Sequence, residues 1–170
     1  VLPFLGVYML NELHFNLKET GIVLSFFGIG AMLGSLLGGY GTDKLGHFKI
    51  QLLSLLLTIP FFILLPQLKT VWSLAFGVLF LSIISESFRP ANSVSIMHYS
   101  RPQNIVRSFS LNRMAVNLGF SIGPAMGGFL SIYSYDFLFY TNGVMTLGAA
   151  IVYYQFFKKS FIIKIFFQFF

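Results

Sequence analysis

Long apolar runs alternate with short polar links along the whole chain. The runs cover residues 1–10, 21–40, 48–65, 71–97, 109–133 and 137–157. A helix needs about 20 mostly apolar residues to cross the roughly 30 Å core of a bilayer, whereas a strand of an outer-membrane barrel needs only about 10. The pattern therefore predicts an all-α integral membrane protein, a bundle of about six transmembrane helices with the first one partial.

The polar links predict where these helices begin and end. After the polar link over residues 11–19, we expect Thr20 to be the N-cap of the second helix. Pro66 closes the third helix, and the fourth is expected to bend at Pro90. Residues 100–108 are predicted to form a loop. The six predicted helices thus form two successive units of three helices each.

Charge is scarce for a chain of this length. Of the 170 residues, 56% are hydrophobic and 9% are charged, with a mean hydropathy of +0.80. A soluble domain carries about 25% charged residues, so this deficit indicates that the chain resides in the lipid bilayer. The formal net charge is +6, but Lys and Arg stand singly or in pairs and build no basic face, so no nucleic-acid partner is expected. With no cysteine, no disulfide or thiolate site is predicted.

The basic residues in the links predict the orientation of the chain. One side carries Lys44, Lys49, Arg101, Arg107, Lys158 and Lys159, and the other carries Lys18 and Lys69. Loops rich in Lys and Arg stay in the cytoplasm. We therefore expect a multi-pass protein of the inner or plasma membrane with both chain ends cytoplasmic.

Glycines recur every fourth residue in two of the predicted helices. The second helix carries Gly30, Gly34 and Gly38, and the fifth carries Gly119, Gly123 and Gly127. This spacing lets a second helix backbone approach closely. One interpretation is ordinary helix packing inside this chain. The other is an inverted three-plus-three repeat over residues 1–157, because the two helices hold the same place in successive units.

A polar, glycine-rich turn over residues 38–49 joins the second and third runs and predicts a tight cationic turn at the membrane surface. Its positions Gly39, Asp43, Lys44, Gly46 and Lys49 resemble the cytoplasmic signature between helices two and three of the major facilitator superfamily, with His47 and Phe48 at places usually basic. Asp43 is expected to complement the positive end of the third helix. The resemblance further implies a charged cytoplasmic latch of Asp43 with Lys44, Lys49 and Arg89.

A second motif lies in the fifth helix. Residues 117–128 contain Gly119, Gly123, Pro124, Gly127 and Gly128 and are similar to the helix-five signature of drug:proton antiporters of that superfamily. The segment 87–92, which carries Arg89, resembles the arginine-bearing part of helix four in such antiporters. Pro124 is expected to make the fifth helix a deformable gating helix.

The resemblance implies secondary active transport of a small molecule, coupled to protons, by alternating access. It covers one of the two six-helix bundles of such a transporter, so the expected partners are the bilayer, a substrate, protons and a second bundle. The tail 158–170 resembles neither the usual central loop nor a seventh helix, and we expect a truncated chain rather than a complete half-size transporter. The alternatives are an inactive fragment and a non-transporting membrane scaffold or accessory subunit.

Four polar residues inside the predicted bundle are candidates for the cavity and proton coupling: Glu86, Arg89, Arg113 and Asn117. Glu86 and Arg89 are three residues apart and predict an ion pair, which is either structural neutralisation or part of the pathway. Arg113 and Asn117 are four apart and are expected to face one cavity, unless Arg113 reaches the interface.

Other chemistry finds no support in the sequence. His14, His47 and His98 lack metal-ligand spacing, so no metal is expected. The glycine-rich turn lacks the Lys-Ser/Thr ending of a phosphate-binding loop, and no cofactor is predicted. We do not expect an enzyme.

Overall fold

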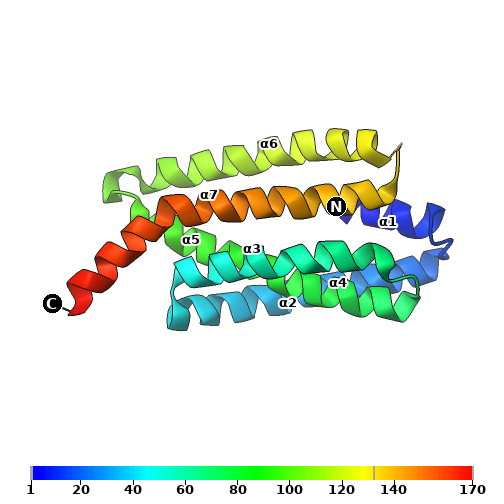
Figure 1. Cartoon of the computed structure of the whole chain (residues 1–170), viewed down its shortest axis with the longest axis horizontal. Coiled ribbons are helices and arrows are strands. Elements are labelled where there is room, and N and C mark those ends of the chain that lie inside the picture. The colour runs from blue at the N-terminus through cyan, green and yellow to red at the C-terminus, as the bar shows by residue number, and fades with distance from the viewer. Residues whose placement is uncertain (1, 132, 170) are drawn as a thin grey trace.

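The computed structural model describes the backbone of residues 2–131 and 133–169 and the side chains of residues 4–131 and 133–157. The described elements are α1 (Leu2–Asn11), α2 (Leu17–Leu45), α3 (His47–Leu64), η1 (Leu65–Gln67), α4 (Val71–Glu86), α5 (Phe88–Tyr99), η2 (Pro102–Asn104), α6 (Ile105–Ser131) and α7 (Tyr135–Phe169). No strand occurs among them. The long helices run side by side along the long axis of the molecule (Figure 1). The predicted all-α membrane bundle is confirmed.

Among the residues that the structure describes, four segments are long and apolar enough to cross a membrane. They are Leu17–Leu45, His47–Gln67, Val71–Tyr99 and Tyr135–Phe157. Helix α6 has 27 residues but carries many polar side chains, and it is absent from this set. Large apolar side chains are exposed along α2, α3, α6 and α7, as expected where lipid takes the place of water.

Helix α2 begins earlier than predicted. Its N-cap is Asn16, whose side-chain oxygen accepts a hydrogen bond from the Glu19 backbone N–H at 2.9 Å. The Glu19 carboxylate in turn accepts one from the Asn16 N–H, which completes a capping box. Thr20 therefore lies inside α2 and the prediction of a cap there is wrong.

The turn between α2 and α3 is also shorter than predicted. Only Gly46 separates the two helices, with φ +86° and ψ 151°, a conformation that favours glycine. The Thr42 hydroxyl donates a hydrogen bond of 2.6 Å to the Gly38 carbonyl and supports the helical end of α2. Asp43 thus stands in the last turn of α2, not at the N-terminus of α3, and α3 has no side-chain cap.

The irregularity in the fourth span falls at Ser87 and not at Pro90. Helix α4 ends at Glu86 and α5 begins at Phe88, so Pro90 occupies the first turn of α5. A proline has no N–H for the carbonyl four residues before it and its ring crowds that carbonyl, which here belongs to Glu86. The effect of Pro90 is therefore felt one turn earlier in the chain.

The ends of the last two helices differ from the sequence prediction. Helix α6 starts at Ile105, directly after η2, so the expected loop over residues 100–108 is reduced to a few residues. Helix α7 runs on to Phe169 and includes the backbone of the predicted tail. The side chains of that tail, with Lys158 and Lys159, lie outside the described residues.

The first glycine ladder lies directly against a neighbouring helix. Helix α2 packs along α4, and a Cβ added at Gly34 would collide with the carbonyl oxygen of Ile83. One at Gly38 would lie 2.5 Å from the Cα of Ser87. The Ser87 hydroxyl donates a hydrogen bond of 3.0 Å to the Gly34 carbonyl across this contact. Packing inside the chain therefore explains the first ladder.

The apolar core lies at the end of the bundle where α1 meets α2, α4 and α7. It consists of Leu5, Tyr8, Met9, Val23, Leu65, Leu74, Ala75, Val78, Leu81 and Phe139. The α3 helix packs on α7, whereas α6 contacts α7, α5 and α1 only lightly. In Figure 1, α6 lies along one edge of the molecule next to α7. The loose packing of α6 leaves space between it, α1 and α7.

Candidate functional site

The predicted ion pair between Glu86 and Arg89 is present. Glu86 Oε2 and Arg89 Nε are 3.0 Å apart, and the pair bridges the break at Ser87. The two side chains differ in environment, because Glu86 is 18% exposed and Arg89 is 73% exposed. An acid enclosed in the bundle is thus held by a base that reaches outward.

Glu86 lines a partly open cavity of about 180 Å³. Its walls come from α1, α2, α3, α4 and α7 and are mostly apolar, with Phe27, Phe62 and Leu81 among them. The polar groups on its walls are Ser85, Glu86 and Asn142. A cavity of this size with these polar groups on its walls is large enough for ordered water at the carboxylate.

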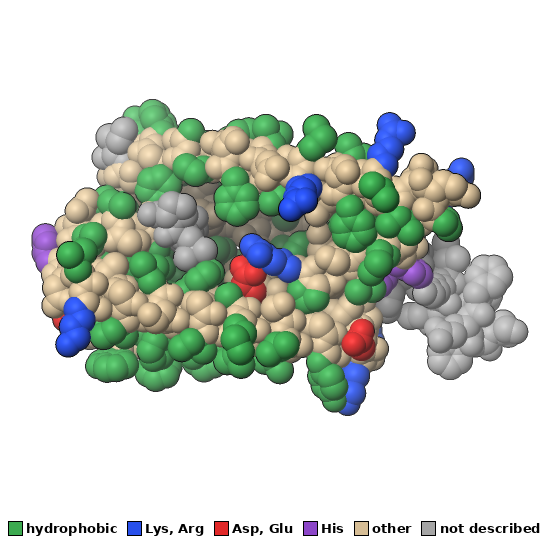
Figure 2. All heavy atoms as spheres, turned by 180° about the vertical axis from the view of Figure 1, so that it is seen from behind, with side chains coloured by type: hydrophobic (Ala, Val, Ile, Leu, Met, Phe, Trp, Pro, Cys, Tyr) green, Lys and Arg blue, Asp and Glu red, His purple; other side chains and the backbone are tan. Residues whose placement is uncertain are grey.

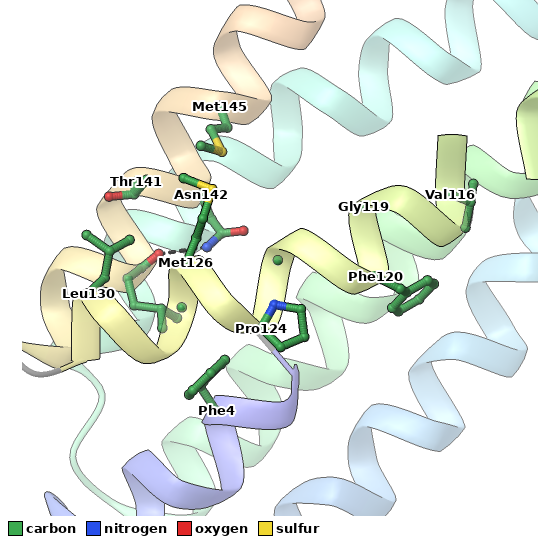
Figure 3. Close-up of a pocket in the computed structure, with 13 residues that line it drawn as sticks. Phe4, Val116, Gly119, Phe120, Pro124, Met126, Leu130, Thr141, Asn142 and Met145 are labelled. Atoms are coloured by element: carbon green, nitrogen blue, oxygen red, sulfur yellow. Dashed lines mark hydrogen bonds between the residues drawn. The ribbon is translucent and has the colours of Figure 1, made fainter. Parts of the chain in front are cut away.

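A second, larger cavity of about 360 Å³ lies between α1, α6 and α7. Figure 3 shows Phe4 of α1, Pro124 and Met126 of α6, and Asn142 and Met145 of α7 around it. Asn142 lines both cavities, so this residue lies between the cavity at Glu86 and the larger one.

The helix-five motif forms one wall of this larger cavity. Gly119, Gly123, Pro124 and Gly127 all line it. A Cβ added at Gly119 or Gly123 would meet nothing within 4 Å, whereas one at Gly127 would lie 2.5 Å from the Phe4 ring, and one at Gly128 3.9 Å from it. The second ladder therefore differs from the first, because most of it faces open space.

The five gate-motif residues gather where α2 meets α3. Asp43, Lys44 and Lys49 are all exposed there. The ammonium nitrogen of Lys44 lies 4.6 Å from the centre of the Tyr40 ring. Among the described side chains no ion pair joins Asp43 to a base. The cytoplasmic latch stays a prediction, as do the roles of Gly39 and Gly46.

Arg113 and Asn117 lie apart from the Glu86–Arg89 pair. Arg113 is exposed and lines an open groove beside Phe109 and Asn112 of its own helix. Asn117 is also exposed, and its backbone carbonyl accepts a hydrogen bond from Ser121 at 3.0 Å. Within the described residues no hydrogen bond or ion pair connects either side chain to Glu86 or Arg89.

A chain of polar side chains that the sequence did not single out ties four helices together. Gln51 of α3 is 1% exposed and donates a hydrogen bond of 3.1 Å to Asn92 of α5. Asn92 donates one of 3.3 Å to Asn112 of α6, and the Tyr153 hydroxyl of α7 donates to the side-chain amide oxygen of Gln51. An amide inside an apolar run was the available signal, because such a group needs partners within a bilayer.

Histidines contribute no cluster of metal ligands. His47 and His98 come together with ring centres 5.1 Å apart and both contact the ring of Tyr99. In the described part of the chain, no three side chains of His, Asp or Glu converge on one point.

The reverse face of the molecule is hollowed below α6. Figure 2 shows acidic and basic side chains meeting beside this hollow, with apolar side chains along its rim. The ion pair in the described residues is the one between Glu86 and Arg89.

Comparison with known proteins agrees with this architecture. The sequence model of the Major Facilitator Superfamily matches residues 1–160. YttB of Bacillus subtilis, an uncharacterised MFS-type transporter, is 30% identical over 154 residues, which cover 85% of this chain and 36% of YttB. Multidrug resistance protein MdtG of Salmonella heidelberg is 29% identical over 141 residues, or 81% of this chain and 34% of MdtG. The chain spans about a third of the length of these relatives. This multi-pass membrane protein belongs to the Major Facilitator Superfamily.

Proposed function

We infer that this chain is one bundle of a secondary transporter that exports a small molecule in exchange for protons. The observation that carries the proposal is the Glu86–Arg89 pair, an enclosed acid paired at 3.0 Å with an outward-reaching base. Ionisable groups at depth in a membrane bundle are costly and usually mark a pathway for ions or substrates. The similarity to MdtG, a multidrug resistance protein, is the reason for proposing export.

The pair offers a simple way to couple a proton to a movement. A proton that binds the Glu86 carboxylate removes its negative charge and with it most of the attraction for Arg89. Arg89, which is 73% exposed, is then released toward the open face. Because the pair spans the break at Ser87, its opening acts where α4 and α5 meet. Alternating access follows if the two arrangements favour opposite sides of the membrane.

A second six-helix bundle is the proposed partner. The relatives are about three times as long as the matched segment, and the hollowed face lies beside the ion pair. We place the α2–α3 turn with Asp43, Lys44 and Lys49 on the cytoplasmic side, in the inner or plasma membrane, as the gate against that second bundle. The two three-helix units form an inverted repeat in this proposal.

The test uses the continuous protein in which this chain is followed by a second six-helix bundle. It is reconstituted into proteoliposomes that enclose a pH-sensitive dye, with ethidium and N-phenyl-1-naphthylamine as first compounds. We expect compound-dependent proton movement that Glu86→Gln removes. A protein that inserts normally and moves neither compounds nor protons would instead indicate a scaffold or accessory subunit.

A further inference from the structure

We propose that α5 and α6 tilt as one unit about Ser87, and that Asn92 controls the tilt through two hydrogen bonds. One bond locks α5 to α3, and the other links α5 to α6. The proposal rests on the proposed function only where it names the opening of the Glu86–Arg89 pair as the trigger. The pivot, the lock and the link are contacts within this chain and do not depend on transport.

Ser87 divides the fourth span into two parts with different contacts. Before it, α4 packs on α2 so closely that a Cβ added at Gly34 would collide with the Ile83 carbonyl oxygen. The apolar core also includes four α4 residues: Leu74, Ala75, Val78 and Leu81. After Ser87, α5 adds no described side chain to that core, and hydrogen bonds join it to α3 and α6. Helix α4 is thus fixed to α2, whereas α5 has polar partners on other helices.

Ser87 has the contacts of a pivot. Its hydroxyl donates a hydrogen bond of 3.0 Å to the Gly34 carbonyl of α2, and a Cβ added at Gly38 would lie 2.5 Å from its Cα. Pro90, in the first turn of α5, has no N–H to donate to the Glu86 carbonyl, so the helix lacks a backbone bond across this position. Ser87 is therefore held on α2 at a point where the helix itself is weakened, and α5 can tilt about it.

The lock joins α5 to α3 and α7. The Gln51 amide nitrogen donates to the Asn92 amide oxygen at 3.1 Å, and the Tyr153 hydroxyl of α7 donates to the Gln51 amide oxygen. Gln51 is 1% exposed, so no bulk water replaces a partner that its amide loses. The ring centres of Tyr99 on α5 and His47 on α3 are also 5.5 Å apart. These contacts hold α5 against two helices that pack on each other.

The link joins α5 to α6 at two places. The Asn92 amide nitrogen donates to the Asn112 amide oxygen at 3.3 Å. Where the two helices turn, the Ser100 hydroxyl donates to the Ser108 hydroxyl at 2.7 Å. Because Asn92 uses its oxygen for the lock and its nitrogen for the link, the two bonds polarise and strengthen each other. The link lies within the tilting unit, so a tilt that breaks the lock carries α6 along with α5.

The trigger is the ion pair, which crosses the pivot. Glu86 is the last residue of α4 and Arg89 lies in the first turn of α5, with 3.0 Å between the carboxylate and the guanidinium. A closed pair holds the start of α5 to the end of α4. When Glu86 is neutral, this attraction is lost and the lock at Asn92 alone opposes the tilt.

Distances between pairs of spin labels on this 170-residue chain in lipid nanodiscs test the proposal. The chain has no cysteine, so labels attach only where a cysteine is introduced. Four exposed positions serve: Leu36 of α2, Phe80 of α4, Met97 of α5 and Met114 of α6. Leu36 paired with Met97 follows α5, and paired with Met114 it follows α6. Leu36 paired with Phe80 is the control across the fixed contact.

Two variants should release the unit. Glu86→Gln removes the negative charge with little change of shape and should populate a second distance in the α5 and α6 pairs, to the same fraction in both. Gln51→Leu removes the lock and should raise that fraction about fivefold above wild type. The α4 pair should keep its wild-type distance in both variants. Unchanged distances in the nearly isosteric Glu86→Gln, or an equal shift of the α4 pair, would overturn the proposal.

Asn112→Leu, combined with Glu86→Gln, tests the link. The α5 pair should still reach the second distance, whereas the α6 pair should reach it to a smaller fraction. Asn117→Leu makes the same exchange at an exposed position of α6 and should leave α6 moving with α5. Equal fractions for α5 and α6 in the Asn112→Leu combination would contradict the link.

The same variants separate this proposal from the proposed function. Joint shifts of α5 and α6 in Glu86→Gln, without any proton-coupled transport by the continuous two-bundle protein, would support the tilting unit and contradict the proposed function. Proton-coupled transport by that protein, with no shift of α5 or α6 in Glu86→Gln, would do the reverse.

Discussion

The carboxylate of Glu86 and the guanidinium of Arg89 lie 3.0 Å apart across the break between α4 and α5, with the acid enclosed and the base largely exposed. The pair therefore connects the inside of the bundle to its open face. Removing one partner of such a pair leaves the charge of the other uncompensated. Measuring expression and transport of such a variant separates a role in folding from a role in transport.

Arg89→Ala in the continuous two-bundle protein should abolish transport at normal expression. Without the guanidinium, protonation of Glu86 has no ion pair to open. Arg89→Lys keeps the charge and should retain part of the activity. Uptake of the two compounds into proteoliposomes gives the activity, and the yield of purified protein gives the expression. Loss of expression in Arg89→Ala, with normal transport by the remainder, would favour structural neutralisation.

Asp43→Asn should impair transport while leaving membrane insertion intact. Asp43 is exposed at the end of α2 and makes no ion pair with the described side chains, so its loss should cost the bundle itself little stability. A transport assay, combined with labelling of a cysteine introduced into the α2–α3 turn, measures transport and membrane insertion. Since Asp43 does not cap α3, unchanged transport would leave it with no role at the gate.

Gly34→Leu should destabilise the bundle strongly. A Cβ at Gly34 would meet the backbone of Ile83, which cannot move aside as a side chain can. Forcing a larger group into a packed contact costs about 1–3 kcal/mol, and about 2–4 °C in melting temperature per kcal/mol for a chain of this size. Thermal unfolding followed by size-exclusion fluorescence measures the shift.

Gly28→Leu is the matched control on the same helix, since nothing lies within 4 Å of its Cβ. It should melt close to wild type. Equal melting temperatures for the two variants would show that the contact between α2 and α4 is not the tight one described above.

The predictability of the fold and the site differed from residue to residue. The Glu86–Arg89 pair was visible in the sequence because its spacing of three places both side chains on one helical face. The N-cap at Asn16 was also readable, since Glu19 stands three residues later, but Thr20 competed as a capping residue nearer the apolar run. A polar link predicts a loop, but here the helix continues beyond its apolar segment into the link.

Contacts between helices were beyond the sequence pattern. The Gly34 ladder predicted close packing but could not name α4 as the partner, and the Gly123 ladder has the same spacing with an open face. Asn112 and not Asn117 turned out to bond to the bundle, because the rotation of α6 about its axis depends on which helices it meets. The sequence pattern did not single out Asn142, because the spacing of residues does not reveal the partner of a lone amide in an apolar run.

Gln51→Leu should loosen α6 by removing the centre of the amide chain. Asn92 would lose its donor and the Tyr153 hydroxyl its acceptor, while Asn112 would be held only by an under-satisfied partner. Polar contacts between membrane helices average about 0.6 kcal/mol with a maximum of about 1.7, so a loss of about 1 kcal/mol is expected. Hydrogen exchange of α6 amides should rise. Gln67→Leu, which removes an exposed amide that donates to the Ile63 carbonyl of α3, should leave it unchanged. Unaltered hydrogen exchange in Gln51→Leu would show that this chain of hydrogen bonds does not hold α6 in place.

The most direct test of the central claim is the luminal pH of proteoliposomes containing the continuous two-bundle protein when N-phenyl-1-naphthylamine is added outside. Exchange of the compound for protons should raise the luminal pH in wild type. Glu86→Gln should bind the compound as wild type does and leave the luminal pH unchanged, because a neutral amide carries no proton across the Arg89 contact. A rise of equal size and rate in Glu86→Gln would contradict the assignment of proton coupling to the pair.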